Sequence, residues 1–529
     1  MPNLSHRIRR LHCLVSTRSQ IDAFAMRKNL RDRWQDTLIP VFESTFDEIA
    51  GSDRIIHIPK LELHIKVNSE QELLDILPEL IQQQLQEQLR SLDLTTIPLT
   101  TISQSGEVLR ETTAQQNQFE ILMHYLQTGS LPWQASSASA SEIAVDLKET
   151  CSNQRSQLIN YLSNRAETAA FYFRLLQLLT RSQALAIIDP LLDRLSTEWK
   201  ITIIEVMGFV SESTQIQLNH PRRSQLVAAI LSRVSSEQIP SNGFSMSLDR
   251  ILTQAGIDRQ VLVDALPSVT ATLFQTQTNF DRPRPDPNLS AVENPEINFL
   301  NDEALRSRLS NEFNHPELNL DSTNLLEEED LDNQDRKFET DFSDEAVNPV
   351  VDFTEQNDRF SLFVNYAGLV LIHPFISPLF EATGIKKTNS HAIADTQMPR
   401  AAALLHFLAR GQEEIYEYEL GLIKILLGLE PETPLLVGVG VLQECDREEA
   451  ETVLQSTINY WSVLGNTSTD GIRSSFLQRS GLLRRTEDSW SLNVEHQSFD
   501  MLLEHLPWTI SIVKLSWMKY PLYTEWQTF

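Results

Sequence analysis

The chain changes character between Thr278 and Asp358, and this change limits how its 529 residues can fold. Prolines interrupt the stretch, and acidic residues dominate its second half from Glu327 to Glu345. Low apolar content combined with high net charge cannot offset the entropy lost when a chain becomes ordered. We therefore predict an acidic, Pro-containing disordered linker over 278–358. A segment that folds on a partner is the alternative.

The flanking regions carry regular apolar spacing, which predicts a predominantly α protein with small α+β modules at both ends. Residues 1–95 are predicted to form strand, helix, strand and helix, the strands at 11–15 and 56–67. The helices are predicted at 21–49 and after a capping box at Ser69 and Glu72. Residues 115–277 are predicted to be helical throughout, as a bundle or a solenoid.

The last predicted domain covers 359–529. Helices are expected at 361–372, 398–410, 416–428, 446–462 and 498–506. A hairpin is expected from 482–485 and 489–494 across Thr486 to Asp488, and a last strand at 510–515. The predicted architecture is therefore a helical middle region and an acidic linker between two small α+β modules.

Charge argues against one class of partner. Asp and Glu total 72 against 44 Lys and Arg, so the net charge is -28. A surface this acidic repels phosphate, which excludes general nucleic-acid binding. The first 35 residues are an exception, because eight basic residues there face two acidic ones. This basic head indicates a polar assembly partner, or simply a solvated helix face.

No pattern of catalytic, cofactor-binding or metal-ligating residues emerges from the sequence. Cys13, Cys151 and Cys445 share no CxxC or Cys–His spacing. No GxSxG motif or complete phosphate loop is present. We therefore predict no enzyme activity, no cofactor and no metal.

One apolar run, 363–380, lacks acidic and basic residues. Pro374 and Pro378 interrupt its second half, and broken backbone pairing is poorly tolerated in lipid. A buried core segment is expected rather than a membrane span. No secretory signal is recognisable, so a cytoplasmic, reducing environment is the default expectation.

Tryptophans are the best candidates for contacts with other proteins. Trp133 and Trp508 each follow a Leu-Pro pair, and Trp517 lies close to the end of the chain. Tryptophan combines a large apolar area with one hydrogen-bond donor, which suits interface anchors. Ordinary core packing beside a proline turn is the competing interpretation.

Several segments, taken in order, resemble the contractile injection system tape measure family. These are "FEILMHYLQTGSLPW" at 119–133, "VNYAGLVLIHPFISPLFEATGI" at 364–385, "RAAALLHFLARG" at 400–411, "YELGLIKILLGLEPETP" at 418–434 and the block at 460–526. The N-terminal "RIIHIPKLELHI" at 54–65 is also similar. The pieces are short, but their shared order along the chain makes the resemblance specific.

The resemblance implies a structural component of a phage-tail-like injection particle. A tape measure is thought to lie in the lumen of the inner tube and to set tube and sheath length. Implied partners are the inner tube, the baseplate or spike, and a tube terminator or cap, with assembly in the cytoplasm before enclosure in the particle. The chain departs from an ideal ruler because it has no long uninterrupted helix. A non-ruler assembly adaptor or a cargo-docking protein of the same particle is the alternative.

Overall fold

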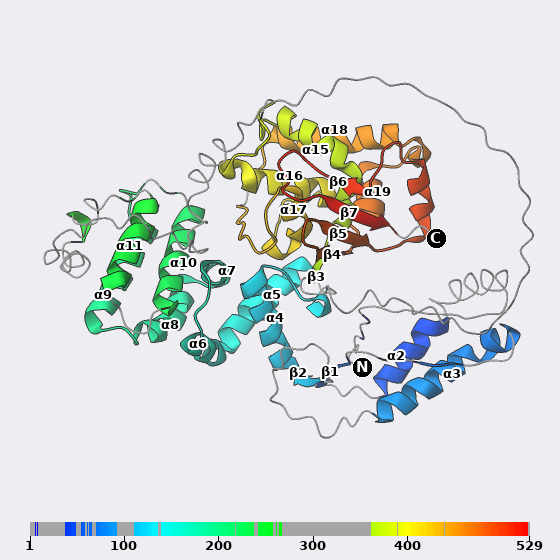
Figure 1. Cartoon of the computed structure of the whole chain (residues 1–529), viewed down its shortest axis with the longest axis horizontal. Helices are drawn as coiled ribbons and strands as arrows, with labels where there is room; N and C mark the ends of the chain where they lie inside the picture. The colour runs from blue at the N-terminus through cyan, green and yellow to red at the C-terminus, as the bar shows by residue number, and fades with distance from the viewer. Residues whose placement is uncertain are drawn as a thin grey trace, which may run out of the picture.

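The computed structural model describes residues 6, 8, 37–48, 54–91, 110–135, 139–266 and 361–526, with short gaps inside these ranges. Three clusters of buried apolar side chains lie within them, at 38–89, at 119–257 joined by Tyr418, and at 362–522. Figure 1 shows the helical region and the C-terminal body side by side, with α4 and α5 nearest to β3. The fold is predominantly α with small sheets towards both ends, as predicted.

The described residues of the N-terminal part form two helices, α2 at Ile39–Asp47 and α3 at Glu70–Ser91. They pack through Leu38, Phe42 and apolar residues of α3. Strand β1, Arg54–His57, pairs antiparallel with β2, Arg110–Thr113. The sequence analysis missed β2, since "RETT" has no apolar alternation, and the observed β1 is shorter than predicted. The strand expected at 11–15 and most of the helix expected at 21–49 lie outside the described residues.

The middle region is a series of helices, as predicted. In the part of this region that the structure describes, α4 and the turn η2 lead into seven further helices. Their bounds are α4 Ala114–Thr128, η2 Trp133–Ala135, α5 Ala140–Asn153, α6 Arg155–Asn164, α7 Ala169–Leu178, α8 Arg181–Leu192, α9 Thr197–Glu212, α10 His220–Ser236 and α11 Asn242–Gln254. Several begin at Ser or Thr caps, for example Ser139, which forms a capping box with Glu142. Polar capping residues thus mark the start of several helices in this series, where the chain changes direction.

The C-terminal body contains a five-stranded sheet in the order β3-β4-β5-β7-β6. All neighbouring strands are antiparallel except β5 and β7, which are parallel. The strands are β3 Ser361–Val364, β4 Gly481–Arg485, β5 Trp490–Val494, β6 Ile512–Val513 and β7 Leu522–Trp526.

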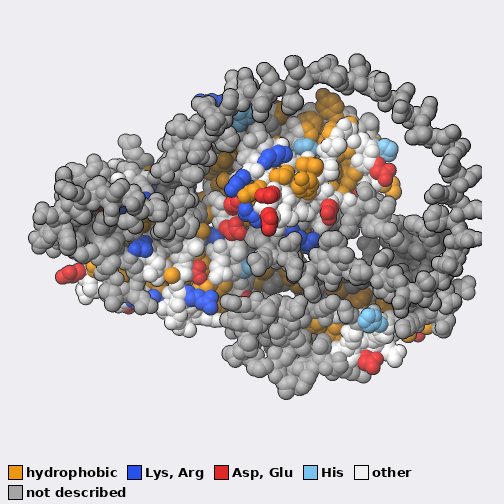
Figure 2. Space-filling model, in the orientation of Figure 1, with side chains coloured by type: hydrophobic (Ala, Val, Ile, Leu, Met, Phe, Trp, Pro, Cys, Tyr) orange, Lys and Arg blue, Asp and Glu red, His pale blue; other side chains and the backbone are white. Residues whose placement is uncertain are grey.

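Helices and short helical turns cover this sheet and share its core. They are η5 Ala367–Ile372, α15 His373–Ala382, η6 Asp395–Gln397, α16 Met398–Arg410, η7 Glu417–Glu419, α17 Gly421–Leu426, α18 Glu444–Tyr460, η8 Ser462–Leu464, α19 Thr469–Ile472, η9 Arg473–Leu477 and η10 Ser498–His505. Their shared core includes Trp461, which is fully buried. On the face seen in Figure 2, acidic, basic and apolar side chains of this body are interspersed.

Three details of the C-terminal prediction were wrong. The expected helix at 361–372 begins with β3, and only 367–372 is helical, as a 3-10 helix. The backbone reverses between them at Tyr366, the one described non-glycine residue with a positive φ, at 60°. The expected strand at 510–515 is reduced to Ile512–Val513, and β7 was not expected.

The domain boundaries proposed from sequence, at 95, 115, 277 and 358, stay predictions. The segment 278–358, predicted to be a disordered linker, lies outside the described residues. On either side of it the chain is folded, because Leu266 packs against the helical cluster and Leu362 lies in the C-terminal core.

Candidate functional site

Two of the segments that carried the family resemblance face each other in the fold. The end of α4 and the following "TGSLPW" turn, residues 128–133, belong to the helical region. The stretch 416–434 belongs to the C-terminal body and contains η7 and α17. We call the contact between these two stretches, together with α7, the seam. It is the candidate functional site, because it joins parts of the chain that are about 250 residues apart.

Gly129 ends α4 in a left-handed conformation, with φ 74°, and its N–H donates to the carbonyl of Tyr125. Glycine tolerates this conformation without a steric penalty. A Cβ at this position would lie 2.6 Å from Nη2 of Arg174. The glycine of the "TGSLPW" motif therefore both turns the chain and leaves room for a guanidinium. Thr128 and Ser130 flank it and hydrogen-bond each other through their hydroxyls at 2.7 Å.

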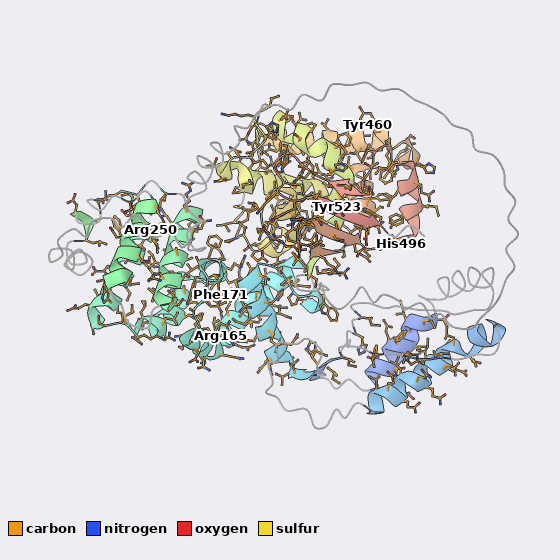
Figure 3. All side chains as sticks on the ribbon, in the orientation of Figure 1. Arg165, Phe171, Arg250, Tyr460, His496 and Tyr523 are labelled. Atoms are coloured by element: carbon orange, nitrogen blue, oxygen red, sulfur yellow. The ribbon has the colours of Figure 1, made fainter. Side chains whose placement is uncertain are left out.

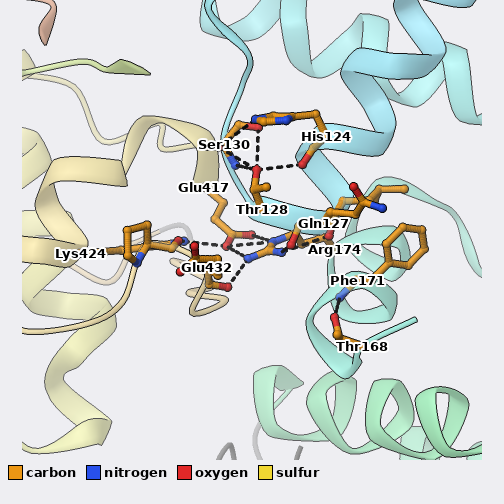
Figure 4. A network of polar contacts seen from close by, with 12 residues as sticks. His124, Gln127, Thr128, Ser130, Thr168, Phe171, Arg174, Glu417, Lys424 and Glu432 are labelled. Atoms are coloured by element: carbon orange, nitrogen blue, oxygen red, sulfur yellow. Dashed lines mark hydrogen bonds and ion pairs between the residues drawn. The ribbon is translucent and has the colours of Figure 1, made fainter. Parts of the chain in front are cut away.

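Arg174 of α7 is fully buried and forms the centre of the seam (Figure 4). Its Nη1 donates to the carbonyls of Leu126 and Gln127 at 3.1 and 3.0 Å, within the helical region. Its Nε and Nη2 donate to the Glu417 carboxylate at 3.2 Å, and Nη2 also reaches the carbonyl of Glu432. One guanidinium thus binds both sides of the seam.

Glu417 receives a second cation from its own side of the seam. Lys424 Nζ lies 2.8 Å from Glu417 Oε1 and 3.0 Å from the carbonyl of Pro431. Burial raises the pKa of Glu417, but the charges of Lys424 and Arg174 outweigh burial and leave that pKa below its ordinary value. Burial lowers the pKa of Lys424, against the opposing attraction of Glu417. The three side chains are therefore a buried, mutually dependent charge cluster.

A second buried carboxylate, Glu419, lies two residues further on. It accepts hydrogen bonds from Tyr366 Oη at 2.6 Å and from Arg410 Nη1 at 2.7 Å, and the N–H of Tyr416 donates to it at 3.2 Å. His406 Nε2 lies 3.6 Å from it, at ion-pair rather than hydrogen-bond distance. Burial raises the pKa of Glu419, yet these partners bring that pKa below its usual value. This carboxylate ties the left-handed Tyr366 to α16 and η7.

Tyrosines form the apolar part of the seam. Tyr418 packs edge-on against Tyr125 of α4, with ring centroids 5.8 Å apart, and stacks on Tyr416 at 5.4 Å. Its hydroxyl donates to the carbonyl of Ala140, the first residue of α5. Beside this contact lies a hollow of about 250 Å³, lined by residues of both sides, among them Leu131, Ile143, Phe363, Tyr366 and Arg410.

The seam is suited to holding two parts of a chain together. Its two buried carboxylates, Glu417 and Glu419, are paired with cations or a hydroxyl donor, and neither is hydrogen-bonded to a serine, cysteine or histidine among the described residues. In the ranges that the structure covers, no group of three His, Cys, Asp or Glu side chains is arranged to hold a metal. A search of the same ranges for a helix of sufficient length and apolarity to cross a membrane found none.

The predicted tryptophan contacts lie at separate places rather than in one site. Trp133 begins η2, next to the seam. The Trp508 indole donates to the carbonyl of Leu371 at 2.8 Å and packs edge-on against Phe375. The Trp517 indole donates to the carbonyl of Leu426 at 2.8 Å and stacks on Phe380. All three are half-buried, so each leaves a surface that a partner could contact.

The sequence analysis did not identify Arg174, Glu417 or Lys424. One signal was available, because Arg174 is the only charged residue of α7, in the apolar run "AAFYFRLLQL". A charge inside such a run needs a buried partner. The partner itself could not be chosen from 72 acidic residues without knowledge of the fold.

Exposed apolar residues of the C-terminal body do not gather into one patch at the seam. Tyr460, at the end of α18, and Tyr523, in β7, are both well exposed and lie apart in Figure 3. Ile512 faces Tyr523 across the β6–β7 pair. These residues therefore add no second site of comparable definition.

Comparison with known families gave one match. The family model described as contractile injection system tape measure protein matches residues 5–526 of the chain. Searches of curated proteins and of solved structures found no match. The family match includes both sides of the seam and the whole stretch between them.

Proposed function

Because the chain belongs to the contractile injection system tape measure protein family, we propose that it sets the length of the inner tube and sheath from within the tube lumen. Membership itself implies a structural protein rather than an enzyme class. It also implies association with other tube components and a place within the injection particle.

The observation that carries the proposal is the order of folded parts along the chain. The helical region continues to Leu266, and the C-terminal body resumes at Ser361. The roughly 94 residues between them would span at most about 340 Å if fully extended. A ruler needs two anchoring parts and a span whose length is encoded in the number of residues, and this order provides both.

The proposal assigns the two folded parts to the two ends of the growing tube. One part binds the baseplate or spike, and the other meets a tube terminator or cap. Rings are added to the growing tube as long as part of the span is not yet covered by it. The protein is made and assembled in the cytoplasm before the particle encloses it. Half-buried Trp133, Trp508 and Trp517 are the proposed contacts with these partners.

The test is the distribution of particle lengths in electron micrographs after an in-frame deletion of residues 290–350. The deletion removes about 60 residues, which shortens an extended span by at most about 220 Å and a helical span by about 90 Å. We expect shorter particles with an equally narrow distribution. A variant in which 290–350 is scrambled at constant length is the matched control and should leave the length unchanged.

An unchanged length after the deletion would contradict the ruler proposal for this segment. It would favour the second candidate, an assembly adaptor or cargo-docking protein of the same particle. The seam supports that candidate, because it holds the two folded parts against each other. An adaptor predicts particles of normal length that lack one component when the seam or a tryptophan contact is changed.

A further inference from the structure

The seam and the chain order together impose a restriction on any ruler. β3 begins at Ser361, and its Phe363 lines the same hollow as Ile143 of the helical region. The helical region is in turn bound to the C-terminal body through Arg174 and Glu417. The stretch 267–360 therefore leaves one side of a joined pair and returns to the other.

While the seam is closed, the stretch 267–360 contributes nothing to the separation of the two folded parts. Its contour could reach about 340 Å, but its ends belong to parts that touch. A span of that kind measures length only after the contact between the parts is broken. A ruler with this topology thus needs two states.

The chemistry of the seam suits an equilibrium between two such states. Buried ion pairs contribute little net stability, because desolvation of the charges offsets most of their attraction. Among the described residues of the C-terminal body, Tyr418 is the buried one that joins the apolar cluster of the helical region, with Tyr416 and Leu436 packed against that cluster. Each side keeps its own large apolar core, so separation need not unfold either one.

The charged residues at the centre of the seam also keep partners on their own side when the two folded parts separate. Arg174 keeps its bonds to the carbonyls of Leu126 and Gln127 on the helical side. Glu417 keeps Lys424 on the other side. Neither half is left with a buried charge lacking a partner, which is the costly outcome for a broken ion pair.

We propose that the seam is a latch, closed in the free protein and open in the assembled particle. Opening separates the two folded parts, so that residues 267–360 can serve as the measured span. This inference rests on the proposed ruler function and adds the step that makes it geometrically possible. In the closed state, the surface around Arg174 contacts the 416–434 stretch of the same chain, and this contact is lost during assembly.

A chemical cross-link can report the latch directly. The carbonyls of Gln127 and Glu432 bind the same guanidinium from opposite sides, and both side chains are exposed. Gln127→Cys and Glu432→Cys, combined with Cys13→Ser and Cys445→Ser, place two thiols across the seam. Cys151 is fully buried and does not compete. A short, cleavable bis-maleimide is the probe, applied to free protein and to assembled particles.

A second cysteine pair controls for access and for folding. Thr486 and Ser489 are joined by backbone and side-chain bonds across the β4–β5 turn, entirely within the C-terminal body. Thr486→Cys with Ser489→Cys should therefore be linked in both free and assembled protein. A thermal melt of both double variants confirms that each is folded before linking.

We expect the seam pair to be linked in the free protein and not in the particle. Protein linked before assembly should give no particles of normal length, and cleavage of the linker should restore them. Linking of the seam pair in both states, or in neither, would overturn the latch. The deletion of residues 290–350 tests the ruler proposal independently of this cross-linking result. Shorter particles with a seam still closed would reject the latch, together with the premise that the span measures length only after the two folded parts separate, while the change in length would still support the ruler.

Discussion

Two buried ion pairs of the molecule differ in what surrounds them. Arg479 and Asp500 lie 2.7 Å apart inside the C-terminal body, separated by 21 residues. Phe476 and Phe499 pack against the same guanidinium. Arg174 and Glu417, in contrast, are 243 residues apart and join two parts that each have a core of their own.

The difference shows how similar chemistry can serve folding in one place and docking in another. Arg479 also binds the carbonyls of Ser475 and Glu495, so it ties local turns into a core that hydrophobic burial already holds together. Arg174 also binds backbone carbonyls, but these lie on both sides of the seam, and the aromatic contact beside it is the Tyr125–Tyr418 pair. Loss of the first pair should loosen one body, and loss of the second should separate two bodies.

The largest predicted effect distinguishes these two outcomes. Arg174→Met leaves Glu417 with Lys424 as its ion-pair partner and removes the donor to the carbonyls of Gln127 and Glu432. Arg479→Met removes the cation from Asp500. Breaking a buried pair typically costs about 3–5 kcal/mol. We expect both variants to have a lower unfolding temperature, but only Arg174→Met should lose cross-linking of the Gln127→Cys and Glu432→Cys pair. Retained cross-linking in Arg174→Met would refute the central role of this arginine.

A somewhat smaller effect is predicted for Trp517→Ala. The indole stacks on Phe380 and donates to the carbonyl of Leu426, so its removal should cost about 2–4 kcal/mol, measured by chemical denaturation. Trp133→Ala is the comparison, because this residue lies on the short turn η2 beside the seam rather than on the C-terminal core. If Trp517→Ala keeps full stability and instead blocks particle assembly, the partner contact outweighs the packing.

Glycine substitutions test the steric requirement of the seam at a lower cost. Gly129 and Gly384 both have a positive φ, 74° and 71°, which a Cβ makes unfavourable by about 1–2 kcal/mol. A Cβ at Gly384 would meet nothing within 4 Å, whereas at Gly129 it would meet the Arg174 guanidinium. Gly129→Ala should therefore be the more destabilising of the two in denaturant titrations. Equal losses would mean that the guanidinium moves aside freely.

Much of the fold followed from patterns that are local in the sequence. Apolar spacing predicted α16 at its observed bounds of 398–410 and the start of α4 to within one residue. The turn residues Thr486 to Asp488 predicted the β4–β5 hairpin. These elements succeed because their signals lie within one or two turns of chain.

The elements that were not predicted from the sequence depend on contacts between distant segments. β7 forms because β5 offers a parallel edge, and β2 forms because β1 lies beside it. Neither cause is visible in the residues of β2 or β7. The seam was not predicted for the same reason, since the Glu417 partner of Arg174 is 243 residues away. Family resemblance identified the segments on both sides of the seam but gave no indication that they meet.

The smallest predicted effect is a dependence of the seam on pH. The pKa of Glu417 is lower in the folded state than its usual value, because Lys424 and Arg174 outweigh the effect of burial. A carboxyl with a lowered folded pKa stabilises the closed seam above its unfolded pKa, and this contribution disappears as pH falls through the folded value. Addition of a maleimide needs the thiolate and itself slows in acid, so the yield is measured relative to the Thr486→Cys and Ser489→Cys pair. Relative cross-linking of the Gln127→Cys and Glu432→Cys pair should accordingly decline below about pH 4.5.

Glu417→Gln is the matched variant for this titration, because it keeps the size of the side chain and removes its ionisation. It should show weak cross-linking at neutral pH and little further change as the pH falls. The Thr486→Cys and Ser489→Cys pair reports the loss of thiol reactivity alone, because it lies within the C-terminal body. A decline in acid that persists in Glu417→Gln would assign the response to Glu419, whose pKa is also lowered, and would move the pH-sensitive contact from Arg174 to Tyr366 and Arg410.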